Sequence, residues 1–426
     1  MKMQTAKGVF DTPPEEKIIK NQVLNTLTEV FELYGFAPLE TPVIERFETL
    51  AAKSGAGEES DALKETFQLT DQGKRKLGLR FEFTTSLARY MAMNTNIKMP
   101  FKRYEFGPVF RDGPIKLGRY RQFWQCDVDT VGTSSMLADA ECIAIISTAF
   151  QKLNFDFEIK INNRKILNGI MTHAGIKEQK EALIAIDKLD KIGKEGVAKE
   201  LEERGYKKSQ IDKLFELILG KVTLTSLKKN LTDPEGIAGL NELEELFSYL
   251  KKMNVKEAVF DISLARGQAY YTGTVIEAYL KKSKINSSIA GGGRFDDMIG
   301  GFIGGGRIVP AVGVSFGLAP IMDAIKMKQD LKIKTPAKVF VLPINALEES
   351  LEIVQELRNA GINTDISLGK KGVSNNLQYA AALGIPYVVI FGEKELAQKK
   401  VRLRDMVSGK ETLLTVKEVI KKLTKK

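Results

Sequence analysis

The amino-acid sequence predicts an α+β core that is interrupted by a helical insertion and followed by a smaller α/β domain. Two strand-like runs joined by turn residues occupy 101–132, and such a pair predicts an antiparallel hairpin. Residues 165–240 are rich in Lys, Glu, Leu and Ile at helical spacing, and strand-like runs return at 255–315. After residue 338, strand and helix patterns alternate, which is typical of an α/β domain. We therefore predict a core at 1–325 with its insertion at about 165–240, a lysine-rich linker at 326–337 and an α/β domain at 338–426.

The first predicted element is a helix that follows Thr12. Thr12 can cap it, the two prolines that follow are tolerated in its first turn, and acidic residues come next. Its apolar face consists of Ile18, Ile19, Val23, Leu27, Val30 and Phe31. Gly35 ends the helix, and Pro38 and Pro42 in the following run indicate an edge strand or irregular chain. Farther along, "LADAECIAIISTAFQKL" predicts a second, apolar helix.

The composition excludes several classes of site. The 426-residue chain has one histidine, His173, and two cysteines, Cys126 and Cys142, without metal-ligand spacing. A His-based metal site or a Ser-His-Asp triad is therefore not expected. The N-terminus lacks an apolar signal segment, and no apolar run approaches the roughly 18 residues of a membrane span. We expect a cytoplasmic protein in a reducing compartment. The formal net charge of +10 permits a nucleic-acid partner without requiring one.

The strongest chemical signal lies in the second strand of the predicted hairpin. With a period of two, one face of this strand carries Arg119, Arg121, Phe123, Gln125, Asp127 and Asp129. The opposite face is mostly apolar and can pack on helices. Guanidiniums, an aromatic ring, an amide and carboxylates on one face predict a polar pocket for a ligand with both anionic and cationic groups. The alternative interpretation is an exposed strand of alternating charge.

A second run adds polar groups of the same kind. Interpreted as a strand, "LGLRFEFTTSLARY" places Arg80, Glu82 and Thr84 on one face. A carboxylate and a hydroxyl at this spacing suit an ammonium group, which needs hydrogen-bond acceptors.

A charged residue ends an apolar row at 259–266. Interpreted as a strand, "VFDISLAR" has one face made of Phe260, Ile262, Leu264 and Arg266. A buried guanidinium without a partner is costly, so Arg266 either reaches water or meets an anion.

Nucleotide binding by a glycine-rich loop is not expected. No GxxxxGK[ST] pattern occurs, and no GxGxxG lies between a strand and a helix. A bound nucleotide would therefore depend on arginines.

These motifs resemble those of the class II aminoacyl-tRNA synthetases, and among them the histidyl-tRNA synthetase family. "GFAPLETPVIERFETL" is similar to motif 1, which lies at a dimer interface, and "FGPVFRDGPIKLGRYRQFWQCDVD" is similar to motif 2. "LARGQAYYTGTVIEA" and "SSIAGGGRFDDMIG" are similar to the two histidine signatures, and "VPAVGVSFGLAP" stands at motif 3. The α/β tail resembles the family's anticodon-binding domain, so the resemblance covers nearly the whole chain.

The resemblance implies a class II catalytic core with an antiparallel sheet. Its implied activity is that of a histidine–tRNA ligase, which activates histidine with ATP to histidyl-adenylate and transfers it to the 3′ end of tRNA(His). A homodimer is implied by motif 1, and Mg²⁺ is expected with ATP.

The resemblance also assigns residues to ATP. Arg111 would grip the α-phosphate, Phe123 would stack on adenine, and Arg119 and Arg121 are candidates for the other phosphates. Arg111 and Arg266 are the expected catalytic residues, because Arg266 would bridge the substrate carboxylate and the α-phosphate.

The histidine site is assigned in the same way. Glu82, Thr84 and Gln125 would hold the α-ammonium, and Asp129 and Tyr271 would contact the imidazole nitrogens. The complete expected set is Glu82, Phe83, Thr84, Arg111, Gln125, Asp129, Arg266, Tyr270 and Tyr271.

Four places depart from the family pattern. The arginine of motif 3 that clamps the γ-phosphate is missing, since Ala319 and Pro320 stand there. Gly113 replaces a glutamate that often accepts the adenine amino group. Ala269 stands where an acidic residue commonly precedes the tyrosines, and Phe295 replaces a tyrosine of the second signature.

Two alternatives remain open at this stage. The first is a synthetase paralogue that no longer charges tRNA, such as the regulatory subunit of ATP phosphoribosyltransferase, which lacks an anticodon-binding domain. The second is a non-enzymatic RNA-binding protein, which would have no reason to keep Arg266 on an apolar strand face.

Overall fold

A computed structural model describes residues 3–52, 61–115, 120–186, 188–220, 222–264, 270–304, 306–328, 333–369 and 372–424. They fall into two compact units, which comprise Met1–Phe10 with Val23–Ala324, and Asp11–Gln22 with Ile325–Lys426. None of the helices in the described residues is long and apolar enough to cross a membrane.

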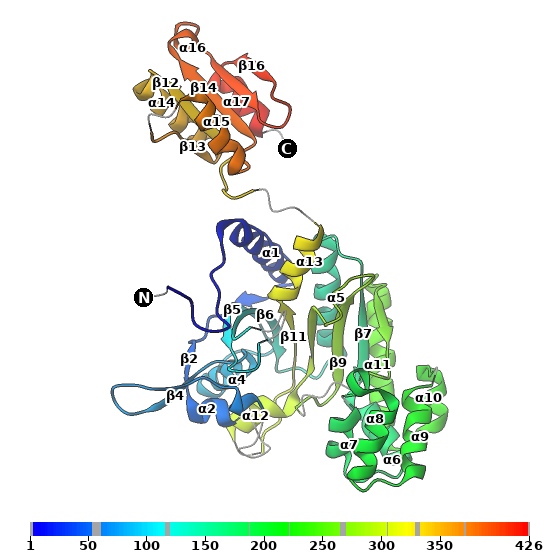
Figure 1. The fold of residues 1–426 in the computed structure, drawn as a ribbon. Coiled ribbons are helices and arrows are strands. Elements are labelled where there is room, and N and C mark those ends of the chain that lie inside the picture. Colours follow the sequence, from blue (N-terminus) through cyan, green and yellow to red (C-terminus); the bar gives the residue numbers. More distant parts are fainter. Residues whose placement is uncertain are drawn as a thin grey trace. The chain divides into compact units, whose positions relative to one another are not determined.

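The first unit is built on an eight-stranded sheet (Figure 1). In spatial order its strands are β1 (Ala37–Pro38), β5 (Phe101–Phe110), β6 (Gln122–Val131), β11 (Ala311–Gly317), β10 (Ala290–Arg294), β9 (Thr274–Leu280), β7 (Phe157–Asn163) and β8 (Ala258–Phe260). The predicted hairpin is confirmed as the antiparallel pair β5–β6. Pairing is antiparallel throughout except at the two edges, where β1 joins β5 and β8 joins β7 in parallel.

The apolar face of this sheet is covered by α5 (Met136–Lys152) and by the part of α1 (Pro14–Leu33) that belongs to the first unit, from Val23 on. Both were predicted from the sequence. The ring of Phe31 on α1 lies 5.5–5.7 Å, centroid to centroid, from the rings of Tyr104, Phe106 and Phe316 on the sheet. The ring of Phe150 on α5 lies 5.6 Å from that of Phe316. Because this face is dry and aromatic, the polar side chains of the same strands must point to the other face.

A smaller sheet and three short helices are formed by the residues between β1 and β5 in the sequence. The small sheet has the order β2 (Ile44–Arg46), β4 (Lys76–Leu79) and β3 (Gln68–Thr70), and it is accompanied by α2 (Phe47–Ala52) and α3 (Asp61–Lys64). Helix α4 (Thr84–Met93) packs against α12 (Asp296–Ile303) through Leu87, Met91 and Ile299. This contact joins the segment before β5 to the segment after β10.

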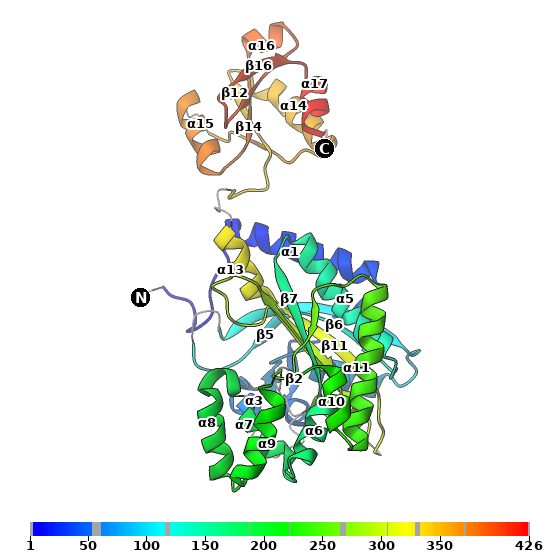
Figure 2. The ribbon, with the colours of Figure 1, turned by 90° about the vertical axis from the view of Figure 1, so that its right-hand side faces the viewer.

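Six helices occupy the described residues between β7 and β8. They are α6 (Arg164–His173), α7 (Gln179–Ile186), α8 (Leu189–Glu203), α9 (Lys208–Ile218), α10 (Leu224–Asn230) and α11 (Pro234–Lys252). Helix α11 returns along the unit and packs on both α5 and α6, whereas α6 to α10 gather beside the sheet (Figure 2).

The second unit contains a five-stranded sheet. Its order is β13 (Thr364–Ile366), β12 (Val339–Ile344), β14 (Tyr387–Gly392), β15 (Val401–Asp405) and β16 (Glu411–Leu414). The first three strands are parallel, as their alternation with α14 (Leu347–Asn359) and α15 (Val373–Ala382) predicts. The antiparallel strands β15 and β16 extend this sheet, and the helices α16 (Glu393–Ala397) and α17 (Val416–Thr424) complete the unit.

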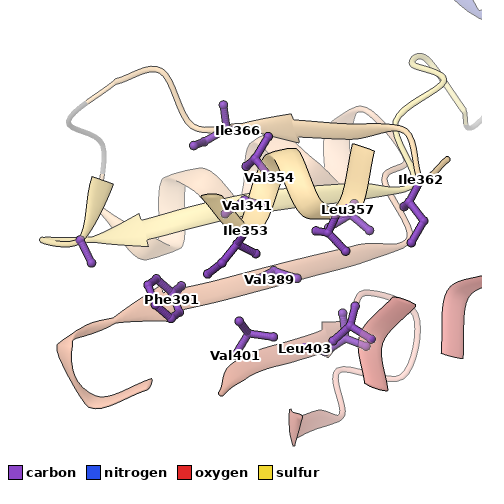
Figure 3. Packing of buried hydrophobic residues seen from close by; sticks show 13 residues of the cluster. Val341, Ile353, Val354, Leu357, Ile362, Ile366, Val389, Phe391, Val401 and Leu403 are labelled. Carbon is purple, nitrogen blue, oxygen red and sulfur yellow. The ribbon is translucent and has the colours of Figure 1, made fainter. Parts of the chain in front are cut away.

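The core of the second unit lies between its sheet and α14 (Figure 3). Ile353, Val354 and Leu357 of α14 lie over Val341 and Val389 of the strands, and all are buried. The spacing of the helical residues, at i, i+1 and i+4, is that of one helix face. Helix α13 (Leu318–Lys328) follows β11 and leads toward this unit.

Candidate active site

The polar face of the main sheet gathers the side chains that the sequence placed together. The strand register aligns Asp127 of β6 with Glu105 of β5 and Ser315 of β11. Two residues farther along β6, Asp129 lies opposite Arg103. Asp127 and Asp129 keep only 6% and 4% of their surface exposed, so this face of β6 is buried and is not a solvated strand face.

Arg103 is a fully buried guanidinium in the middle of this face. Its Nη2 lies 2.8 Å from Oδ2 of Asp129, and its Nη1 lies 3.5 Å from Oε2 of Glu105. The other oxygen of Glu105 accepts hydrogen bonds from Nη1 of Arg80 at 3.0 Å and from the hydroxyl of Thr41 at 2.7 Å. Cations and carboxylates thus alternate across β5 and β6, and this pairing is what makes their burial tolerable.

Burial raises the pKa of both aspartates. Desolvation, reinforced by the charge of Asp129, raises the pKa of Asp127 to about 8 against the attraction of Arg103. Desolvation also raises the pKa of Asp129, to about 6, because the attraction of Arg103 offsets only part of it. Burial therefore favours the protonated form of Asp127, whereas Arg103 favours the ionised form of Asp129.

Two glycines form the floor beside these carboxylates. A β-carbon on Gly313, which pairs with Asp129, would lie 1.9 Å from Oδ1 of that carboxylate. A β-carbon on Gly293, the next residue in the row, would lie 2.3 Å from the carbonyl oxygen of Thr274 and 3.0 Å from the ring of Tyr271. Only glycine lets the aspartate and the tyrosine approach the strands so closely.

Tyr270 and Tyr271 form the wall next to this floor. Their ring centroids lie 4.6 Å apart, and burial raises the pKa of both phenols. The ring of Phe295, at the start of α12, meets Tyr270 edge-on at 6.4 Å. Phe295 thus fills this position with an apolar ring, and no hydroxyl is available there.

The run that contains Glu82 and Thr84 is not a strand, which corrects the sequence prediction. Strand β4 ends at Leu79, and Thr84 is the first residue of α4. Glu82 instead accepts hydrogen bonds from the backbone N–H of Thr85, at 2.8 Å, and from its hydroxyl. A carboxylate at this place satisfies an N–H at the helix N-terminus, where negative charge is favoured.

The same correction changes how the neighbouring side chains lie. Phe83 is fully buried, and the guanidinium of Arg80 lies 4.4 Å from its ring centroid. Thr84 is half-buried at the start of α4. The charge of Glu82 acts on both Asp127 and Asp129, which places Glu82 near the pocket although it is not on the predicted strand.

An arginine and an aromatic ring lie together at the open end of β5 and β6. The guanidinium carbon of Arg111 lies 5.0 Å from the ring centroid of Phe123, and its Nε donates to the carbonyl of Phe81 at 3.2 Å. Arg121 forms an ion pair with Asp112 at 3.0 Å. These groups can bind a phosphate and a flat heterocycle without a glycine-rich loop.

Some of the predicted site residues lie outside the described residues, namely Arg119, Arg266 and Ala269. The strand predicted up to Arg266 is shorter than expected, because β8 ends at Phe260 and residues 261–264 form a turn. The side-chain amide of Asn162 holds this turn by donating to the carbonyls of Ile262 and Leu264 at 3.1 and 3.0 Å.

The sequence prediction missed several buried charges. Arg103 and Glu105 were not assigned to the site, although counting back from the hairpin loop aligns them with Asp129 and Asp127. Arg294 of the second signature forms a buried ion pair with Asp139 of α5 and donates to the carbonyl of Thr133 at 3.0 Å. No local pattern signals that pair, since its members are far apart in the sequence.

An antiparallel sheet with a buried polar face, an arginine–aromatic pair at its end and a separate α/β unit together define the class II aminoacyl-tRNA synthetase fold. Two family models agree with this description: histidyl-tRNA synthetase matches residues 8–321, and the anticodon binding domain matches residues 338–426. The chain belongs to the histidyl-tRNA synthetase family.

Individual relatives match over the whole chain. Histidine–tRNA ligase 1 of Bacillus cereus is 42% identical over 417 residues, which cover 96% of this chain and 95% of the relative. The histidine–tRNA ligase of Clostridium tetani is 36% identical over 97% of this chain and 96% of its own. The crystal structure of histidyl-tRNA synthetase from Nostoc sp. PCC 7120 superposes with a TM-score of 0.88, at 34% identity, over 99% of this chain and 100% of that one.

A further solved structure bears on the regulatory alternative. An ATP phosphoribosyltransferase regulatory subunit/histidyl-tRNA synthetase from Bacillus halodurans superposes with a TM-score of 0.74 over 89% of this chain and 97% of that one. At 21% sequence identity, this superposition shows that the two proteins share a fold and says nothing about activity.

Proposed function

We propose that this protein is a histidine–tRNA ligase, which uses ATP to convert histidine to histidyl-adenylate and transfers the histidyl group to the 3′ end of tRNA(His). The observation that carries the proposal is the polar face of the main sheet. Gln125, Asp127 and Asp129 lie in a row on this face of β6, near Tyr271, and Arg111 lies beside Phe123 of the same strand. Full-length similarity to histidine–tRNA ligases supports it. The matched anticodon binding domain supports a protein that binds tRNA.

The first step joins two anionic groups. A carboxylate oxygen of histidine attacks the α-phosphorus of ATP, and pyrophosphate leaves with the bonding electron pair. Negative charge therefore accumulates at one point, where fixed guanidiniums stabilise it and orient the attack. In the proposal Arg111 and Arg266 supply these guanidiniums, Phe123 stacks on adenine, and Arg119 and Arg121 contact the remaining phosphates.

The second step transfers the activated acyl group. A hydroxyl of the terminal ribose attacks the carbonyl carbon of histidyl-adenylate, and AMP leaves. The donors that neutralise the α-phosphate in the first step also stabilise the departing AMP, so one set of arginines serves both steps.

Selection of histidine rests on paired buried polar groups. Asp129 and Tyr271 contact the imidazole nitrogens, Tyr270 lies beside them, and Glu82, Thr84 and Gln125 form the ammonium end of the site, with Phe83 buried beneath it. A pocket of this kind rejects an analogue that leaves its polar groups unpaired by roughly 10⁴–10⁵-fold.

Exchange of labelled pyrophosphate into ATP, measured with each of the twenty amino acids in turn, tests this function. We expect exchange with histidine alone, followed by charging of tRNA(His). A folded protein that exchanges with no amino acid but still binds RNA would instead support the RNA-binding alternative. Histidine binding without exchange would support the regulatory paralogue.

Replacement of Arg266 by histidine is expected to abolish adenylation while histidine and ATP binding stay measurable. The reason is that a neutral imidazole cannot neutralise the carboxylate and the α-phosphate together. Binding by calorimetry and exchange by label transfer separate the two effects. Exchange at the wild-type rate would refute the proposed role.

A homodimer is proposed from the motif 1 resemblance of residues 35–50. Sedimentation at micromolar concentration is expected to give twice the monomer mass of 47.3 kDa. A monomer under these conditions would contradict it.

Mg²⁺ is proposed to accompany ATP. The described residues contain no group of three or more His, Cys, Asp or Glu side chains that could hold a metal ion. Mg²⁺ is commonly held by nucleotide phosphates, waters and one or two carboxylates, so a preformed protein cage is not needed.

A further inference from the structure

Asp127 has no assigned role in histidine or ATP binding, yet it lies in the middle of the buried polar face of β6. It lies between Gln125 and Asp129 on the same face of β6 and opposite Ser315. It is 94% buried, since only 6% of its surface is exposed. Its Oδ1 is buried and has no hydrogen-bond partner among the described residues.

Gln125, two residues before Asp127 on the same face, also has a buried oxygen without a hydrogen-bond partner among the residues described. Its Nε2 donates to the hydroxyl of Ser315 at 3.2 Å, whereas its Oε1 is buried and lacks a partner in the described part of the chain. A buried acceptor without a donor is costly, and two such acceptors side by side on one strand face are unusual unless a ligand supplies the donors.

The α-ammonium of an amino acid is the donor that fits. It carries a positive charge and three N–H groups, and it can donate to three acceptors at once. The pocket offers Oδ1 of Asp127, Oε1 of Gln125 and the carboxylate of Glu82, whose charge acts on Asp127.

Asp129 is not an equivalent candidate. Its Oδ2 also lacks a hydrogen-bond partner among the described residues, but it lies 2.8 Å from Nη2 of Arg103, so the negative charge of Asp129 is already balanced inside the protein. The oxygen of Asp127 therefore has the greater need for a cationic donor, and Asp129 can act as an acceptor for a neutral ring N–H.

We propose that Asp127 is a specificity-determining residue that binds the α-ammonium of histidine together with Gln125 and Glu82. The inference rests on the proposed histidine activation and assigns a substrate contact to a residue that the family resemblance leaves out. It also divides the two aspartates between the two ends of the substrate, because Asp129 remains for the imidazole.

The surroundings of Asp127 predict a proton exchange on binding. The charged or titratable groups near it are Asp129, Arg103, Glu105, Glu82, Tyr270 and Tyr271. Burial favours the protonated form of Asp127, whereas a bound ammonium favours the ionised form, so histidine binding is expected to release a proton.

Replacement of Asp127 by asparagine tests the contact with almost no change in shape. We expect KM for histidine in the exchange reaction to rise by roughly 10- to 150-fold, the range for hydrogen bonds to charged groups. KM for ATP is expected to stay unchanged, because the ATP groups Arg111 and Phe123 lie at the other end of the strands. Proton release on histidine binding, measured by calorimetry in two buffers, should disappear.

Two substrate analogues distinguish an ammonium contact from a general disturbance of the pocket. Histidinol keeps the ammonium and the ring, whereas imidazolepropionate keeps the ring and lacks the ammonium. D127N is expected to weaken competitive inhibition by histidinol as strongly as it weakens histidine, and to leave inhibition by imidazolepropionate unchanged. Equal weakening of both analogues, or no weakening of histidinol, would overturn the proposal.

Glu257→Gln is the matched control. The two carboxylate oxygens of Glu257 already accept from the side chains of Ser147 and Gln151 on α5, outside the histidine site. It should leave the KM for histidine unchanged.

A second substitution, Asp127→Ser, keeps the test valid if the asparagine protein folds poorly. The serine protein should show the same difference between the two analogues. If the wild-type protein shows no histidine-dependent exchange, the proposed function fails. If it does and D127N keeps the wild-type KM for histidine, only this inference fails.

Discussion

Replacement of Arg111 by alanine is expected to lower histidine-dependent ATP–pyrophosphate exchange by about 10²–10³-fold, the cost of removing one preorganised donor from a developing oxyanion. The expected loss is large because Arg111 is held before substrate arrives. Its Nε is bonded to the carbonyl of Phe81, and the ring of Phe123 lies 5.0 Å from its guanidinium carbon. Neither contact has to form during the reaction, so the guanidinium costs no reorganisation when charge develops.

Arg111→Lys separates charge from geometry. Lysine keeps the positive charge but lacks the planar fork that binds two oxygens and stacks on an aromatic ring. We expect its exchange rate to lie between those of the wild type and the alanine variant, with the larger part of the loss in kcat. The measurement is exchange at varied ATP and histidine.

A matched control comes from Arg89 on α4, a partly buried arginine that pairs with Glu45 at 2.8 Å outside the pocket. Arg89→Ala removes a similar group and should leave exchange near the wild-type rate. If Arg111→Ala also exchanges at that rate, or if its loss is confined to the KM for ATP, the transition-state role of Arg111 is wrong.

Replacement of Arg103 by methionine is expected to lower the free energy of unfolding of the first unit by about 3–5 kcal/mol, as found when one partner of a buried ion pair is removed. Methionine roughly preserves length and apolar stem, so the change is mainly one of charge. It leaves Glu105, Asp127 and Asp129 buried with one guanidinium fewer. Urea denaturation followed by Trp124, which lies on β6, measures the loss.

The pH dependence of this loss follows from the two aspartates. Their native pKa values, about 8 and about 6, exceed the unfolded value of roughly 3.9. The stability that each neutral carboxyl contributes is therefore complete below pH 4 and is lost as pH rises through its native pKa. Since Arg103 stabilises the ionised forms, removing it should cost less at pH 5 than at pH 8.

A double variant completes this prediction. Adding Asp129→Asn to Arg103→Met removes an ionised carboxylate that has lost its partner, so the pair should cost less than the sum of the two single changes. Strict additivity, or a loss for Arg103→Met that does not grow between pH 5 and pH 8, would show that Arg103 does not balance Asp129.

Local sequence patterns determined much of this fold. The alternation in 101–132 predicted β5, β6 and the shared face of Gln125, Asp127 and Asp129, because side chains of a strand alternate with a period of two in any context. The apolar residues of α1 and α5 likewise predicted these two helices, since a helix with one apolar face is recognisable from its own residues. The alternation of strands and helices after residue 338 predicted the α/β unit.

The tertiary structure decided the rest, for two physical reasons. Local spacing cannot show where a strand stops. Glu82 has the period of a strand residue, yet it accepts from the backbone N–H of Thr85 in the first turn of α4, and β8 ends before the turn that Asn162 holds. Spacing also cannot show which polar groups meet across strands that are distant in the sequence. The unsatisfied oxygen of Asp127 lies opposite Ser315 only because the register brings residues nearly 190 positions apart onto one buried face, where low polarity makes every unpaired charge count.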